Sequence, residues 1–142
     1  QMNGNKMDLR FSALPENEAF ARLAVSAFVL PLNPNLEEME DVKTAVSEAV
    51  TNAIIHGYQG KGGEVRLQAQ YDGESKSLCV EISDEGVGIA DIQKAREPLF
   101  TSRPDLERSG MGFAVMESFM DQLEVQSALG KGTKVRMTKR FT

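Results

Sequence analysis

Three polar residues, Glu48, Asn52 and His56, recur at intervals of four in the segment VSEAVTNAIIHGY, residues 46–58. Residues at i, i+4 and i+8 share one face of an α-helix. The amide oxygen of Asn52 suits Mg²⁺, an oxygen-seeking ion that also bridges phosphates. Glu48, one turn earlier, stands where a general base could take a proton from an attacking hydroxyl. For this helix alone, a solvated polar stripe is the alternative, and we expect His56 to be a satisfied helix-end histidine.

The segment DEGVGI, residues 84–89, comes directly after a predicted strand. Gly86 and Gly88 would let the backbone approach a ligand closely. Asp84 would then accept hydrogen bonds at the base of a pocket. An ordinary turn has the same residue types, so this segment by itself is equally compatible with a purely structural role.

Two further glycine segments follow. SGMGF, residues 109–113, opens a predicted helix, where unpaired N–H groups suit a phosphate, and Arg108 could add a charged donor to a terminal phosphate. GKGT, residues 130–133, is by itself better explained as a plain hairpin turn. All three glycine segments and the Glu48–Asn52 pair occur in one order in one small chain, and this combination favours a nucleotide site.

The elements that must position these residues can be read from hydrophobic periodicity. They are a strand at 7–11, a helix from 17 to about 30, a helix from the N-cap Asn35 to about 56, strands at 64–71 and 77–83, an irregular segment at 85–110, a short helix around 111–120, and strands near 123–127 and 133–139. This order predicts an α+β fold, a two-layer sandwich with helices packed on one face of a mixed, largely antiparallel sheet. Long irregular segments inside compact domains are usually functional.

Composition narrows the class of protein. A chain of 142 residues predicts a single domain, 1–142. The net charge of −5 argues against direct nucleic-acid binding, which requires clustered Lys and Arg. The single cysteine, Cys79, excludes an intramolecular disulfide, and no apolar run is long enough to span a membrane. We therefore expect a cytoplasmic protein without membrane contact.

The ordered motifs resemble the nucleotide-binding (Bergerat) fold shared by gyrase and the histidine kinases. The segments VSEAVTNAIIHGY, DEGVGI, PLFTSRPDLERSGMGF and VMESFMD are most similar to the anti-sigma-F factors of endospore-forming bacteria, which are small serine kinases. The resemblance extends from the first strand to GKGTKV, over essentially the full chain. It implies binding of ATP or ADP with Mg²⁺.

The resemblance also implies roles for individual residues. Asn52 would coordinate Mg²⁺, Glu48 would be the catalytic base, and Asp84 would bind the adenine amino group. Thr133 would support Asp84, often through water. Residues 96–110 would form the ATP lid. The remaining nucleotide-binding residues would be Gly86, Gly88, Arg108, Ser109, Gly110, Met111, Gly112 and Phe113.

Partners follow from the resemblance alone. The family holds a sporulation sigma factor inactive, phosphorylates an anti-anti-sigma factor on serine, and acts as a homodimer. Arg22, on the first helix beside Phe20, is similar to a family contact position for both partners. A solvated arginine on an exposed helix face is the alternative.

Two other functions remain open at this point. The first is a histidine-kinase-type catalytic domain acting in trans, which needs a phosphoacceptor histidine on a dimerisation helix pair. The one histidine, His56, lies within the nucleotide motif, and we expect no helical hairpin before the domain. Glu48 also favours a hydroxyl acceptor, because a serine must lose its proton on attack. The second is a nonenzymatic module that binds partners in a nucleotide-dependent way.

Overall fold

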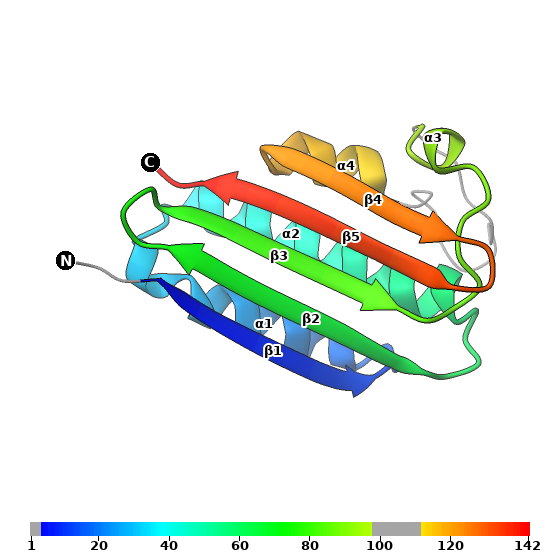
Figure 1. The fold of residues 1–142 in the computed structure, drawn as a ribbon. Coiled ribbons are helices and arrows are strands. Elements are labelled where there is room, and N and C mark those ends of the chain that lie inside the picture. The colour runs from blue at the N-terminus through cyan, green and yellow to red at the C-terminus, as the bar shows by residue number, and fades with distance from the viewer. Residues whose placement is uncertain (1–3, 98–111) are drawn as a thin grey trace.

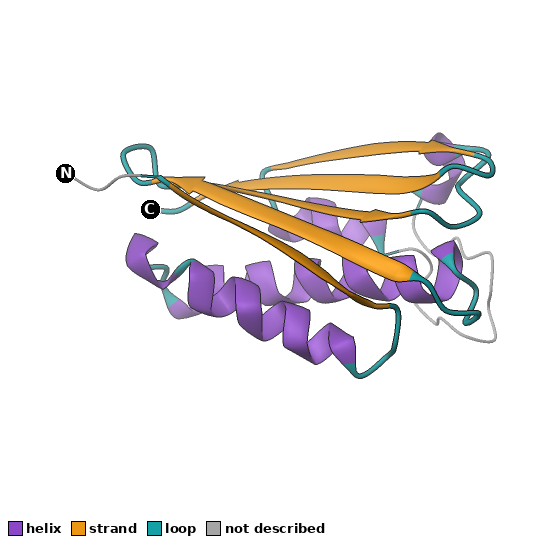
Figure 2. Cartoon of the chain, turned by 60° about the horizontal axis from the view of Figure 1, so that its bottom comes forward, coloured by secondary structure: helices purple, strands orange, loops and turns teal. Residues whose placement is uncertain are grey.

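The structure, a computed structural model, describes residues 4–97 and 112–142. In this part of the chain, a five-stranded sheet has the order β1-β2-β3-β5-β4, and every neighbouring pair is antiparallel. Helices cover one face of the sheet and leave the other open (Figures 1 and 2). The predicted α+β, two-layer architecture is confirmed. The elements are β1 (Asn5–Ser12), α1 (Asn17–Phe28), α2 (Leu36–Asn52), β2 (Glu64–Asp72), β3 (Ser77–Asp84), α3 (Ile92–Ala95), α4 (Phe113–Phe119), β4 (Gln122–Ala128) and β5 (Gly132–Arg140).

Helix α2 begins where the sequence predicts. The side chain of Asn35 accepts a hydrogen bond from the Glu38 backbone N–H at 2.7 Å, and the Glu38 carboxylate accepts one from the Asn35 N–H at 3.0 Å. This reciprocal capping box satisfies two N–H groups that would otherwise lack partners at the helix start. The second Glu38 oxygen accepts from the Thr142 backbone N–H at 2.9 Å. The start of α2 is thereby joined to the end of the chain.

The end of the same helix differs from the expectation. The α-helical hydrogen bonding stops at Asn52, and the next turn, Ala53–Gly57, is π-helical. Its hydrogen bond runs from the Tyr58 N–H to the Ala53 carbonyl at 3.0 Å. A π-turn widens the helix by one residue and is often found at functional sites. The polar stripe of Glu48, Asn52 and His56 therefore ends in a π-helical turn, where the spacing of residues differs from that of an α-helix.

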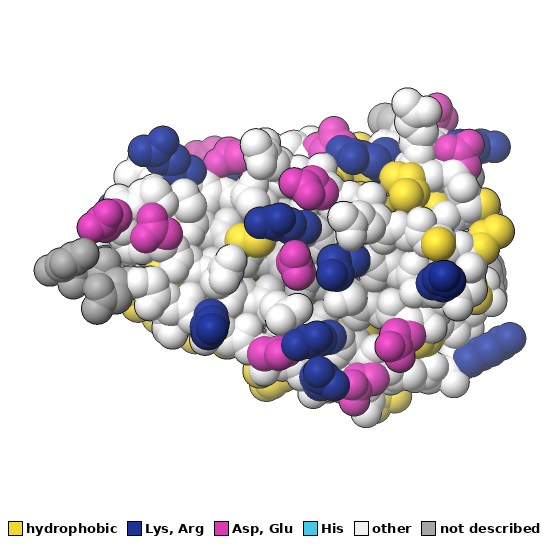
Figure 3. Space-filling view, viewed as in Figure 1, with side chains coloured by type: hydrophobic (Ala, Val, Ile, Leu, Met, Phe, Trp, Pro, Cys, Tyr) yellow, Lys and Arg dark blue, Asp and Glu magenta, His cyan; other side chains and the backbone are white. Residues whose placement is uncertain are grey.

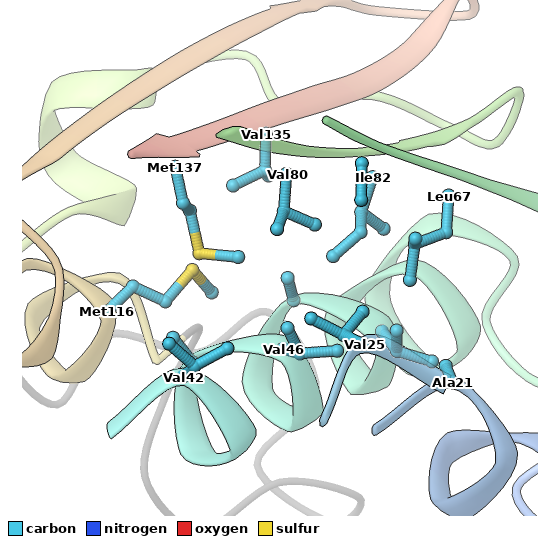
Figure 4. Packing of buried hydrophobic residues seen from close by; sticks show 14 of the residues in the cluster. Ala21, Val25, Val42, Val46, Leu67, Val80, Ile82, Met116, Val135 and Met137 are labelled. Atoms are coloured by element: carbon cyan, nitrogen blue, oxygen red, sulfur yellow. The ribbon is translucent and has the colours of Figure 1, made fainter. Parts of the chain in front are cut away.

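The hydrophobic core lies between the sheet and the helices (Figure 4). Side chains of α1 and α2 point upward and meet those that project from β2, β3 and β5. Alternate strand positions are buried because successive side chains point to opposite faces of a sheet. The residues that meet in this layer include Val25, Val46, Leu67, Val80, Ile82, Met116, Val135 and Met137.

Two local elements differ from the sequence reading. Helix α1 ends at Phe28, and Pro31 lies in a short 3₁₀ turn, Leu30–Leu32, that follows it. The segment expected to be irregular contains the short helix α3, whose N-cap Asp91 accepts a hydrogen bond from the Lys94 backbone N–H at 3.0 Å. No helix in the described residues has the length and apolar character needed to cross a membrane.

The open face of the sheet is polar, with basic and acidic side chains interspersed (Figure 3). Arg66 on β2 makes a two-pronged contact with Asp8 on β1, at 3.0 and 2.6 Å. This ion pair holds the pKa of Asp8 below its ordinary value. Hydrophobic atoms gather instead at the right-hand end of the view in Figure 3.

Candidate nucleotide-binding site

A cavity of about 350 Å³ lies at the end of α2, between the π-turn, the C-terminal end of β3 and the loop after it. Its size falls at the lower end of the roughly 300–1,000 Å³ usual for small-molecule sites. Val87 and Leu129, exposed by 43% and 68%, are part of its lining. Buried polar side chains from the predicted motifs line it as well: Asn52, His56 and Asp84.

Asp84, the last residue of β3, is buried in this cavity. Its Oδ1 accepts a hydrogen bond from the Gly86 N–H at 2.9 Å. Burial raises the pKa of Asp84 from 3.8 to about 6, and backbone hydrogen bonds from Gly86 and Thr133 oppose that rise. At neutral pH the group is therefore mostly an ionised carboxylate, an acceptor-only group suited to a ligand N–H donor.

The glycines of this region allow parts of the protein's own backbone to touch. A Cβ on Gly86 would lie 1.9 Å from the Gly57 carbonyl oxygen, which instead accepts a hydrogen bond from the Val87 N–H at 2.8 Å. Gly88 has φ +78°, and a Cβ there would lie 2.1 Å from the Ala128 carbonyl oxygen. The sequence reading assigned these glycines to close approach of a ligand. In the structure, the nearest atoms belong to the end of the helix and to the β4–β5 turn.

Tyr58, which the sequence reading did not single out, connects the same elements. Its hydroxyl donates to the Glu64 carbonyl at 2.5 Å and accepts from the Glu85 N–H at 2.8 Å. The Glu85, Gly86 and Val87 N–H groups are thus bonded in turn to Tyr58, Asp84 and Gly57. This ladder holds the loop that follows β3 against the end of the helix.

Asn52 and Glu48 occupy different parts of the site. Asn52 is buried and lines the cavity, as the prediction requires. Glu48 is half-buried and is not among the residues that line the cavity. Its carboxylate lies against Gly112 instead, because a Cβ on Gly112, which has φ +72°, would come within 2.2 Å of Glu48 Oε2. Glu48, one helical turn before Asn52 along α2, therefore faces the start of α4.

The remaining predicted residues divide into three groups. Thr133 and the buried Phe113 line the cavity with Asp84. Arg22 lies away from it on α1, where it forms an ion pair with Glu18 at 3.0 Å. The predicted phosphate-binding residues of the lid lie outside the described residues: Arg108, Ser109, Gly110 and Met111.

Two parts of the cavity wall were not predicted. His56 was expected only to end the helix, but it is buried in the wall beside Gly57. Lys94 and its N-cap Asp91 reach the cavity from α3, a helix that the sequence reading did not anticipate. Aspartate is a favoured N-cap residue, so Asp91 was the available signal.

Comparison with known proteins shows the family of the chain. A model of the histidine kinase-like ATPase domain family matches residues 11–139. The chain is 62% identical over 137 residues to an anti-sigma F factor of Clostridium acetobutylicum, covering 96% of this chain and 94% of that protein. It is 58% identical to an anti-sigma F factor of Clostridium botulinum, strain Eklund 17B, covering 99% and 97%. It is 50% identical to one of Pasteuria penetrans, covering 99% and 93%.

Solved structures show the same fold at low sequence identity. The RsbU and RsbW domains of a Mycobacterium tuberculosis protein match with a TM-score of 0.69 and 18% identity, over 96% of this chain and 32% of that one. A blue-light activated histidine kinase of Erythrobacter litoralis matches with a TM-score of 0.55 and 23% identity, over 74% and 45%. From the match over residues 11–139 and the near-full-length relatives, the chain belongs to the histidine kinase-like ATPase domain family and, within it, to the anti-sigma F factors.

Proposed function

We propose that this protein is an ATP-dependent serine kinase and an anti-sigma factor. It holds a sporulation sigma factor inactive, and it inactivates an anti-anti-sigma factor by phosphorylating it on serine. One observation carries the enzymatic part of this proposal. Asp84 at the end of β3 contacts the helix end at Gly57, Asn52 faces the cavity from the last turn of α2, and Glu48 lies one turn earlier against the start of α4.

The adenine end of the site is at Asp84. The buried carboxylate accepts a hydrogen bond from the exocyclic amine of adenine, and apolar side chains such as Ile82 and Val135 in the cavity wall pack against the base. Guanine has a carbonyl where adenine has this amine, so its oxygen would face the carboxylate. This arrangement supports ATP and ADP over GTP.

The residues present fit a magnesium ion at the other end. Within residues 4–97 and 112–142, no cluster of three His, Cys, Asp or Glu side chains could hold a metal by itself. Mg²⁺ is usually bound by one or two protein oxygens, water and substrate phosphates, so a single amide oxygen from Asn52 is sufficient. The bound ion supplies charge neutralisation for the phosphates. Asn52 is the residue of this chain that would hold it.

Glu48 provides the base for transfer to serine. The serine oxygen of the partner attacks the γ-phosphorus, the bond from that phosphorus to the bridging oxygen breaks, and ADP departs. The proton of the serine hydroxyl passes to the Glu48 carboxylate. The position of Glu48 supports this role, because its carboxylate lies against Gly112 where α4 begins, one helical turn from Asn52.

Several further parts of the proposal rest on the relatives and on the sequence. The chain forms one domain, 1–142, acts in the cytoplasm as a homodimer, and closes residues 96–110 over the nucleotide as a lid. Arg108 contacts the terminal phosphate that ATP has and ADP lacks, so the two nucleotides stabilise different lid states. Arg22, placed on α1 beside the exposed Phe20 and Leu23, contacts both partners.

A phosphotransfer assay tests this function. The protein is incubated with γ-labelled Mg-ATP and an anti-anti-sigma factor, and a sigma factor is tested separately for nucleotide-dependent binding. Acid-stable phosphoserine on the anti-anti-sigma factor, together with sigma-factor binding, is the expected result. An acid-labile phosphohistidine on a partner would favour the histidine-kinase alternative. Partner binding without any phosphotransfer would leave a nonenzymatic nucleotide-dependent module.

A further inference from the structure

Asp84, Thr133 and Ser127 are direct neighbours on three adjacent strands. In the β-ladders, Asp84 on β3 pairs with Thr133 on β5, and Thr133 pairs with Ser127 on β4. Asp84 and Thr133 line the cavity. Ser127 lies behind Thr133, in a shallow groove beside the β4–β5 turn. Ser127 itself is not part of the cavity lining, but it contacts two residues that are, Thr133 and Ile89.

The Ser127 hydroxyl has three polar neighbours, all at normal hydrogen-bond distances. The Ile89 N–H lies at 2.7 Å, the Gly132 carbonyl oxygen at 2.8 Å and the Thr133 hydroxyl oxygen at 2.8 Å. A serine hydroxyl has one hydrogen to donate and two lone pairs that accept. An N–H can only donate and a carbonyl can only accept. The one assignment that uses all three contacts has Ser127 donating to Gly132 and accepting from both Ile89 and Thr133.

The opposite assignment leaves two oxygens facing each other. If Ser127 donated its proton to Thr133, its contact with the Gly132 carbonyl at 2.8 Å would join two lone pairs with no hydrogen between them. A half-buried acceptor pair of this kind costs free energy and has no compensating bond. The Thr133 hydroxyl hydrogen is therefore committed to Ser127, and the free lone pairs of Thr133 Oγ1 can only accept.

From this geometry we propose that Ser127 is a positioning residue that makes the base-recognition end of the cavity an acceptor-only surface. Ser127 does so by holding the Thr133 hydroxyl hydrogen away from the ligand. The inference rests on the proposed function, in that Asp84 and Thr133 face the purine. It adds the residue that sets the polarity of that contact and thereby excludes purines that have an oxo group at position 6.

The acceptor-only groups of Asp84 and Thr133 can contact the purine directly or through a bridging water. A 6-amino group donates to acceptor-only neighbours, whereas a 6-oxo group presents another acceptor and gains no hydrogen bond. A bridging water that donates both of its hydrogens to Asp84 and Thr133 turns its lone pairs toward the purine. That water also accepts from an amine and opposes an oxo group. Either way, discrimination depends on the direction of a hydrogen that Ser127 controls.

The test compares ATP with inosine triphosphate, in which an oxo group replaces the amine and N1 has a hydrogen. Dissociation constants of both are measured with Mg²⁺ by calorimetry for the wild type, Ser127→Ala, Thr133→Val and the double variant. Ser127→Ala frees the Thr133 hydrogen to donate, so we expect the preference for ATP to fall by about tenfold. Ser127→Ala also removes the contact with the Ile89 N–H, and the Thr133→Val background measures what that loss alone does to the ratio. In the Thr133→Val background, Ser127→Ala should leave the ratio unchanged, because the hydroxyl it acts through is gone.

Two controls accompany these variants. Ser127→Thr retains the hydroxyl and should restore the wild-type ratio even if the added methyl weakens both nucleotides. Ser83→Ala removes a hydroxyl beside Asp84, at a neighbouring ladder position paired with Lys134, and should not change the ratio. A wild-type ratio in a Ser127→Ala protein that still binds ATP would overturn this inference alone. A wild-type protein that does not bind ATP would overturn the proposed function and this inference with it.

Discussion

The carboxylate of Asp84 lies directly against the backbone of Gly57, 27 residues earlier in the chain. A Cβ on Gly57 would come within 2.7 Å of the Asp84 carboxyl carbon and 2.8 Å of both its oxygens. The end of the helix that carries Asn52 is therefore in contact with Asp84, the residue proposed to bind adenine. Any side chain at position 57 must move that carboxylate.

We expect Gly57→Ala to weaken ATP binding by at least tenfold and to destabilise the protein by about 1–3 kcal/mol, the usual cost of overpacking. Calorimetric titration and thermal unfolding measure the two effects. The matched background is Asp84→Ala, which removes the atoms that the new methyl group would meet. Gly57→Ala should cost clearly less stability there. An equal cost in both backgrounds would show that the methyl group meets something other than Asp84.

Asp84→Asn should weaken adenine nucleotides by several-fold or more, because an amide N–H₂ in place of one carboxylate oxygen mismatches the adenine amine. A mismatched buried polar group costs about 1–3 kcal/mol. GTP should compete poorly for the wild-type site. Competition binding with a labelled ATP analogue gives both values. Equal competition by GTP and ATP against the wild type would place the base elsewhere.

The same substitution should change how stability depends on pH. The pKa of Asp84 is raised from 3.8 to about 6 in the folded protein, so folding favours the protonated form. That contribution is fully present below pH 3.8 and is lost as the pH rises through 6. Asparagine does not titrate, so the stability of Asp84→Asn relative to the wild type should rise by roughly 2 kcal/mol between pH 4.5 and 7.5. Denaturant unfolding without nucleotide measures this difference. A gap that stays constant over this range would contradict the assigned pKa.

Asn52→Ala should abolish Mg²⁺-dependent nucleotide binding while the protein remains folded. Asn52 faces the cavity from the last turn of α2, so its loss removes a ligand for the ion without opening the core between sheet and helices. Titration of ATP with Mg²⁺ and with a chelator separates metal-dependent from metal-independent affinity. Circular dichroism checks the fold. An unchanged affinity for Mg-ATP would remove Asn52 from the metal site.

Glu48→Gln should leave ATP binding and sigma-factor binding intact and should reduce phosphotransfer by roughly 10²–10⁴, the usual contribution of a positioned general base. Glutamine has the same size and hydrogen-bonding reach but cannot take up the proton. Single-turnover phosphorylation of the anti-anti-sigma factor under saturating Mg-ATP measures the effect. Glu37→Gln, on the exposed first turn of α2, makes the same charge change far from the site and should phosphorylate normally. A wild-type rate for Glu48→Gln would show that Glu48 is not the general base.

The sequence determined the features that depend on neighbours along the chain. Strand alternation, the Asn35 cap and the position of Asp84 at a strand end were all readable because they depend on local periodicity and capping chemistry. The α+β architecture followed from the order of those elements. The segment that contains Glu48 and Asn52 was also identified correctly as a helix.

Only the tertiary structure decided which groups meet. The contacts that shape the site join residues far apart in sequence, such as Ile89 with Ser127 and Glu85 with Tyr58. Whether a hydroxyl joins two distant segments by hydrogen bonds depends on which segments pack around it. Neither Tyr58 nor Ser127 could therefore be identified from its residue type. Helix periodicity likewise could not reveal the π-turn after Asn52, because α and π turns differ by one residue in hydrogen bonding and not in composition. The glycines could be predicted as positions of close approach. The atoms that they approach could not, because these depend on how the end of the helix and the β4–β5 turn pack against the end of β3.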